Sequence, residues 1–214
     1  MTVSEPSSTE SAAQRAYDDT KLRIIRGDLP GGSWLSETTV CERLGLSRTP
    51  VHEAFLRLAA EELLTLEARK GAVVRAMSPH EVNDVVEMRE AIETSAARRA
   101  IEHDDPRLHG ALRDLLERQE TCRASGDLDG FIDADDAFHQ AVVAASQNPI
   151  AVHFSRLLRD RAQRLRHQSL RLRPADVTAT LADHRQMAAA IEARDHQAFS
   201  EVLHRHLGLV RGSL

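Results

Sequence analysis

Residues 36–61 constrain the fold of this chain most, because they have the pattern of two short helices joined by a tight turn. Ser36 is a residue type that caps helices, and apolar Val40, Leu44 and Leu46 follow it on one side of the first helix. Such a helix-turn-helix inserts its second helix into the major groove of DNA. The pattern therefore predicts double-stranded DNA as a partner.

The turn and the second helix support this prediction. Gly45 stands where the first helix must end with a positive φ, a conformation that glycine adopts most easily. The apolar positions that follow keep helical spacing: Val51, Ala54, Phe55, Leu58 and Ala59. The second helix begins with Ser47, Arg48 and Thr49, whose side chains can meet phosphates or base edges. We predict that these three residues bind DNA.

A β-hairpin is predicted directly after the two helices. Residues 64–67 and 72–75 alternate as short strands do, around a turn at 68–71. Arg69 and Lys70 occupy the tip of this wing, where they are expected to lie near the DNA backbone. Before the two helices, a helix is expected over 13–26, with Tyr17, Leu22 and Ile25 facing inward. The polar residues 1–12 are expected to form a disordered tail.

Composition limits the extent of any DNA-binding surface. The net charge is −5, and residues 1–76 carry almost as many basic as acidic side chains, so any DNA-binding surface must be a local patch. Aromatic residues make up only 3% of the chain, which favours packed helices over sheets. Cys41 and Cys122 lie far apart without metal-ligand spacing, as reduced thiols of an intracellular protein do. Neither a membrane span nor a signal pattern is present, so a cytoplasmic location without a membrane partner is expected.

A second, all-helical domain is predicted from residue 77 to residue 214. Ser78 followed by Pro79 and Glu81 is a capping box that begins it. Six amphipathic helices are separable, at 79–101, 106–124, 128–146, 149–169, 175–194 and 196–211. The expected fold class is mainly α: a winged helix-turn-helix at 13–76, then an antiparallel bundle of about six helices.

The bundle contains a pattern typical of metal ligands. Asp135 and His139 are four residues apart, so they share one face of a helix. His184 and His206 lie in the fifth and sixth helices of the bundle. Three imidazoles and one carboxylate suit Zn²⁺, Ni²⁺ or another first-row divalent ion. A single helical histidine is more often an ordinary surface or core residue than a ligand.

Residues 16–211 resemble the GntR family of bacterial transcription regulators, in its FadR-like branch with an all-helical FCD ligand domain. The resemblance rests on the segments Gly27–Gly31, Leu35–Glu37 and Leu44–Val51, on Glu53-Ala54, and on Leu58 and Gly71. It implies that Gly71 belongs to the DNA-contacting wing. The chain departs from the family at His52, a DNA-contact position where the family usually has Arg, and at Glu62, where it usually has Gly.

The resemblance also selects the metal ligands. Asp135 and His139 fit the family's Asp-x-x-Phe-His motif, His184 fits the histidine of its next-to-last helix motif, and His206 fits its terminal His-Leu. It implies one divalent ion per subunit, zinc before nickel, manganese or iron. His204 is left out, because two residues on a helix differ by about 200° in direction.

Arg89 is the candidate effector-binding residue. It matches the family's Arg-x-x-x-Glu pattern with Glu93, in which the arginine faces a cavity, and a guanidinium suits a carboxylate ligand. The alternative is an exposed pair between Arg89 and Glu93. A run of arginines over 156–166 spreads around its helix, so most are expected in solvent and one or two near the cavity.

The leading interpretation is a homodimeric transcription regulator, most often a repressor in this family. It would bind a near-palindromic operator and respond to a small organic acid held by Arg89 and the metal. One rival is a di-iron enzyme of the helical-bundle type, suggested by Glu201-x-x-His204, but a second copy of that motif is missing. We therefore expect no enzyme activity. The other rival is a DNA-binding dimer whose bundle binds no effector.

Overall fold

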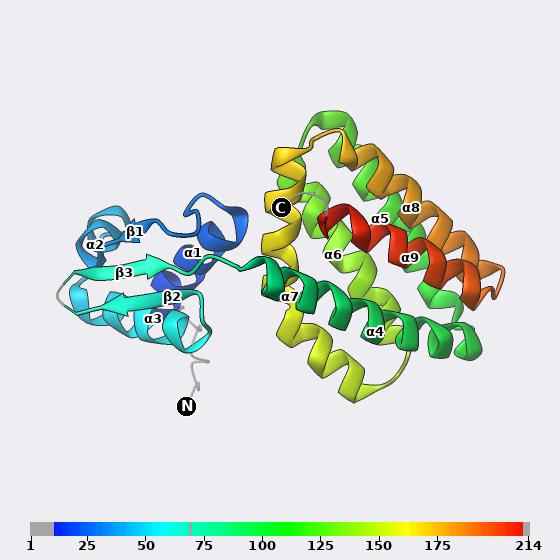
Figure 1. Cartoon of the computed structure of the whole chain (residues 1–214), viewed down its shortest axis with the longest axis horizontal. Coiled ribbons are helices and arrows are strands. Elements are labelled where there is room, and N and C mark those ends of the chain that lie inside the picture. Colours follow the sequence, from blue (N-terminus) through cyan, green and yellow to red (C-terminus); the bar gives the residue numbers. More distant parts are fainter. Residues whose placement is uncertain (1–10, 69, 212–214) are drawn as a thin grey trace, which may run out of the picture. The chain divides into compact units, whose positions relative to one another are not determined.

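The computed structural model describes residues 11–68 and 70–211, which form two compact units that divide between Met77 and Ser78 (Figure 1). Two predictions lie outside the described residues, namely most of the disordered tail at 1–12 and the wing residue Arg69. Among the residues described, no helix has the length and apolar character that a membrane span requires.

The first unit contains three helices and a small sheet. The helices are α1 (Ala12–Arg26), α2 (Glu37–Leu44) and α3 (Arg48–Ala60), and the strands are β1 (Trp34–Leu35), β2 (Leu64–Glu67) and β3 (Gly71–Val74). The hydroxyl of Ser36 accepts a hydrogen bond from the Thr39 amide at the start of α2, and Gly45 ends that helix at φ 66°. These are the predicted cap and turn, so the helix-turn-helix is confirmed.

The sheet is antiparallel in the order β1-β3-β2, and β3 pairs Leu64 with Val74 and Glu67 with Gly71. The hairpin of β2 and β3 is the predicted wing, whereas β1 was not predicted because two residues are too short to show alternation. Gly71 has φ 108°, and a Cβ there would lie 2.6 Å from the Leu35 carbonyl oxygen of β1. Glycine is therefore needed for the backbone of the wing to approach β1.

The prediction for α1 was wrong at one position. Tyr17 and Ile25 are buried as expected, but Leu22 is 46% exposed. The helix buries Thr20 and Ile24, and Leu22 is two residues from each of them. That separation turns its side chain by about 200°, away from the core.

The second unit is a helical bundle. Its helices are α4 (Pro79–His103), α5 (Pro106–Ser125), α6 (Leu128–Ala145), α7 (Pro149–Leu172), α8 (Asp176–Glu192) and α9 (His196–Arg211). Proline occupies the first turn of α4, α5 and α7, where its missing amide hydrogen costs nothing. The weakest predicted break, between α8 and α9, is formed by Arg194 at φ 57° and by Asp195, which accepts from the Ala198 amide.

Helix α6 is the centre of the bundle and packs against α4, α5 and α7 (Figure 1). It buries side chains on most of its circumference, polar as well as apolar ones: Phe131, Ile132, Ala134, Asp135, Asp136, Phe138, His139, Val142 and Val143. Helices α8 and α9 pack against each other, and both contact α4. This arrangement brings polar residues of α6, α8 and α9 into one interior.

Candidate metal centre and DNA-contact surface

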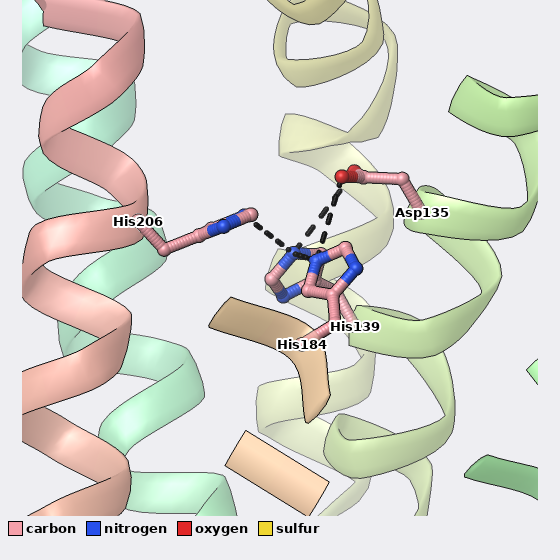
Figure 2. Close-up of side chains that lie close together, drawn as sticks. All are labelled: Asp135, His139, His184 and His206. Atoms are coloured by element: carbon pink, nitrogen blue, oxygen red, sulfur yellow. Dashed lines mark hydrogen bonds and ion pairs between the residues drawn. The ribbon is translucent and has the colours of Figure 1, made fainter. Parts of the chain in front are cut away.

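Four side chains from three helices converge inside the bundle. Asp135 and His139 come from α6, His184 from α8 and His206 from α9 (Figure 2). One ligand-type atom from each lies within 4.8 Å of the corresponding atoms of the others, and all four residues are buried. The structure therefore brings together the predicted metal set. His204 points elsewhere and lies on the surface, where its Nδ1 is 2.8 Å from Glu90 Oε1.

The outer nitrogens of two imidazoles have acceptors. Nδ1 of His184 lies 2.6 Å from Oε1 of Gln119, and Nδ1 of His139 lies 2.7 Å from Oε2 of Glu93. Carboxylate and amide oxygens accept but do not donate, so both Nδ1 atoms carry the proton. Partners of this kind fix the tautomer and the ring orientation of metal-binding histidines. The ring of Phe138 stacks on His184 at 4.6 Å between centroids and supports it from α6.

The inner nitrogens of His139 and His184 consequently present lone pairs, and Nε2 of His206 is also an acceptor because the Arg166 guanidinium lies 2.6 Å from it. Nε2 of His139 lies 3.2 Å from Nε2 of His206 and 3.3 Å from Nε2 of His184. Oδ1 of Asp135 is 3.5 Å from the His184 nitrogen, and it is buried without a hydrogen-bond partner among the described residues. Acceptors so close together repel unless a cation lies among them. Three nitrogens and one oxygen fit a first-row divalent ion.

The protonation states agree with this interpretation. Burial lowers the pKa of His184 to about 3 despite the attraction of Asp135, and it lowers the pKa of His206 well below its usual value. Burial opposes ionisation of Asp135, but Arg166 and the histidines outweigh it and lower the pKa of the carboxyl. Neutral imidazoles and an ionised carboxylate are the forms that bind metals.

A small cavity of about 20 Å³ adjoins Asp135, one of the four residues. Three arginine–acid pairs line it: Arg89–Glu93, Arg159–Asp136 and Arg166–Asp135. Arg89 Nε is 2.8 Å from Glu93 Oε1, so the predicted pair exists. The pair is buried, however, and Arg89 lines the cavity, which excludes the exposed alternative. A role for Arg89 in effector binding stays a prediction.

Sequence reasoning did not single out Arg166, Gln119 or Asp183 as members of this site. Arg166 is buried, and its Nη2 is 2.6 Å from Nε2 of His206. It shares one stripe of α7 with Arg159, seven residues earlier, and this spacing could have separated these two from the run of arginines. Gln119 carries no sequence signal. Asp183, whose Oδ2 lies 3.8 Å from Nδ1 of His206, is marked only by its place beside His184.

The predicted DNA contacts lie on the surface of the first unit. Arg48, Thr49 and His52 are exposed on α3, as is Ser47 just before it, and Lys70 is exposed on the wing. The Ser47 side chain makes no cap hydrogen bond, so it does not use the amides at the start of α3. Helix N-termini of this kind attract phosphates.

The two departures from the family pattern both have structural partners. His52 lies 2.6 Å from Glu37 of α2 through Nδ1, and this contact holds its ring on the surface. Glu62 adopts φ 60°, a left-handed conformation that explains a preference for glycine, and its carboxylate is 2.7 Å from Arg75.

Comparison with known proteins gives consistent results for both units. Residues 12–74 match the family model for bacterial regulatory proteins of the gntR family, and residues 84–209 match the FCD domain model. The HTH-type transcriptional repressor RspR of Escherichia coli (strain K12) is 29% identical over 93% of this chain and 87% of its own. The gluconate operon transcriptional repressor of Bacillus subtilis (strain 168) is 28% identical over 93% of this chain and 83% of its own. The solved structure of E. coli McbR/YncC superposes with a TM-score of 0.77 at 25% identity, covering 92% of this chain and 94% of that one.

Proposed function

The chain belongs to the GntR family of bacterial transcription regulators with a C-terminal FCD domain, and we propose that a metal centre and a small carboxylate in that domain control its affinity for operator DNA. Its relatives and its fold are those of regulators and not of enzymes, so the di-iron alternative is wrong. GntR regulators bind DNA, which leaves the control of binding as the question.

The observation that carries the proposal is that three imidazole nitrogens and one carboxylate oxygen lie within 4.8 Å of one another. In the proposal, Asp135, His139, His184 and His206 hold one divalent ion per subunit, with zinc preferred and nickel, manganese or iron as alternatives. When bound, such an ion would relieve the repulsion among the acceptors and attract an anionic effector.

On the DNA side, a homodimer would place its two α3 helices in successive major grooves of a near-palindromic operator. The proposed contacts come from both parts of the motif: Ser47, Arg48, Thr49, His52, Arg69, Lys70 and Gly71. A small carboxylate held by Arg89 and the metal would be the effector. It would act only through a difference in affinity between DNA-competent and DNA-incompetent arrangements of the dimer.

The test compares metal-loaded and chelated protein on DNA from the protein's own promoter. We expect about one divalent ion per subunit, and fluorescence anisotropy should show that acids from a carboxylate panel change operator affinity only in the loaded protein. If loaded and chelated protein respond identically to every acid, the metal does not take part in regulation. Operator binding that no acid alters would favour a dimer without an effector.

A further inference from the structure

Arg166 lines the cavity and also contacts the candidate ligands. It comes from α7, it is 2% exposed, and its guanidinium reaches two of the four residues. Nη2 is 2.6 Å from Nε2 of His206, and Nε is 3.5 Å from Oδ1 of Asp135. A buried positive charge therefore already contacts the atoms to which a divalent ion would bind.

The hydrogen bonds of Arg166 are incomplete. Its Nε and Nη1 are buried and have no hydrogen-bond partner among the described residues. By contrast, Arg89 donates from Nε to Glu93 at 2.8 Å, and Arg159 donates from Nε to Asp136 at 2.7 Å. Buried donors without acceptors are costly. Of the three arginines that line the cavity, Arg166 thus has the strongest need for an added acceptor.

Arg166 and a metal ion would compete for the same nitrogen of His206. A guanidinium can only donate, so Nε2 of His206 accepts from Arg166, and this nitrogen has a single lone pair. A guanidinium hydrogen and a metal ion cannot share that lone pair. Two buried cations also repel each other at short range. Binding of a metal would therefore take away the hydrogen-bond acceptor of Arg166.

We propose that Arg166 receives the effector carboxylate and couples its binding to that of the metal. Metal binding removes the guanidinium from His206, and the paired donors of Arg166 then take the two oxygens of a carboxylate. Moving the side chain also enlarges a cavity that now holds little more than one water molecule. The inference rests on the proposed metal centre, and it moves the main anionic contact from Arg89 to Arg166.

Coupling of this kind is reciprocal, so a carboxylate must strengthen metal binding by the same factor by which the metal strengthens carboxylate binding. The experiment measures the Kd for zinc by competition with a fluorescent chelator. It is run in sodium acetate and in acetamide, a neutral molecule of the same shape, at constant ionic strength. Arg166→Gln, Arg166→Lys and Arg156→Gln are compared with the unmodified protein. Arg156 is exposed on the same helix, so its variant removes the same charge away from the cavity.

In the unmodified protein and in Arg156→Gln, acetate should tighten zinc binding at least about fivefold and acetamide should not. Arg166→Gln should bind zinc at least as tightly without acetate, because the competitor is gone, and should lose the acetate effect. Arg166→Lys keeps the charge without the planar pair of donors, so most of the effect should be lost there too. If acetate tightened zinc binding in both Arg166 variants as much as in the unmodified protein, the proposal would be overturned. It would also be overturned if acetate had no effect on the unmodified protein. If the unmodified protein takes up no zinc, the metal centre itself fails.

Discussion

The polar residues assigned to DNA and those assigned to the metal differ in what surrounds them. Arg48, Thr49 and Lys70 are exposed on the first unit, and solvent can replace a DNA contact made by any one of them. His139, His184 and their neighbours are buried in the second unit, and each is held by another buried polar group. The contributions of the exposed residues are expected to be independent of one another, whereas each buried residue depends on its buried partners.

This difference has energetic consequences. Loss of an exposed contact removes one interaction, and the remaining contacts are expected to add nearly independently. Loss of one buried member leaves its partners with unsatisfied charge or hydrogen bonds, so its effects spread through the network. Substitutions, acid and salt should therefore act differently on the two units.

The largest effect is expected at the metal. His206→Ala removes a proposed ligand, and because even outer partners of ligands contribute about 10–100-fold to metal affinity, the loss should exceed about 100-fold. His204→Ala is the control, since its imidazole lies two residues away on α9 and faces Glu90 on the surface. Metal content after dialysis measures both. Full occupancy in the His206 variant would contradict the ligand assignment.

The next effect concerns the operator. Arg48→Ala should weaken binding by about 1–3 kcal/mol and relax specificity at one base pair, as expected for an arginine that reads a base edge. Its melting temperature should stay unchanged, because Arg48 is exposed. Footprinting and anisotropy on the promoter provide the measurement. An unaltered footprint would remove Arg48 from the DNA surface.

In metal-free protein, acid should lower the free energy of unfolding of the helical unit more than that of the first unit. The folded-state pKa of His184 is about 3 against an ordinary value of 6.5, so below pH 6.5 the unfolded chain binds a proton that the folded unit does not. The free energy of unfolding should therefore fall by about 1.4 kcal/mol per pH unit for this imidazole as the pH decreases from about 6. His206 acts in the same direction, and Glu93, with its pKa of about 2, adds to the loss below pH 4.5.

The first unit is the internal reference for that experiment. Its one histidine, His52, is exposed. Denaturant unfolding at a series of pH values, followed separately for the two units by hydrogen exchange, should show the steeper loss in the helical unit. Equal slopes for the two units would contradict the protonation states assigned to the buried histidines.

The smallest effect is expected at the wing. Lys70→Ala should weaken binding to all DNA sequences alike and reduce the slope of log affinity against log salt by about 1, because one phosphate contact is lost. Measurements on operator and unrelated DNA at several salt concentrations check this. A sequence-dependent loss would mean that Lys70 contacts bases.

Much of the fold followed from local chemistry that the sequence displays. The cap at Ser36, the turn at Gly45 and the proline-initiated helices were predictable, because each depends on residues within one helical turn. The strand β1 and the exposure of Leu22 were not, because both depend on what packs against the segment. Short strands and helix faces are decided by tertiary neighbours.

The convergence of the four candidate ligands was predictable, and their surroundings were less so. Asp135 and His139 show the spacing of residues on one helix face, and resemblance to a family selected the histidines of the other helices. Nothing in the segment around Gln119 distinguishes it, so its role depends on the packing of α5 beside α6. Arg166 is marked only by its spacing of seven residues from Arg159. Partners that come from distant segments leave no local pattern.

The wide spacing of the ligands has a consequence for the ribosome-bound chain. His139 precedes His184 by 45 residues and His206 by 67 residues. At about 5–20 residues per second, the last ligand is synthesised roughly 3–13 s after His139. During that interval a nascent bundle has Asp135 and His139 without α9, and Arg166 lacks its contact with His206. Completion of the proposed metal centre would thus be a late step in the biogenesis of this protein, after synthesis of the DNA-binding unit.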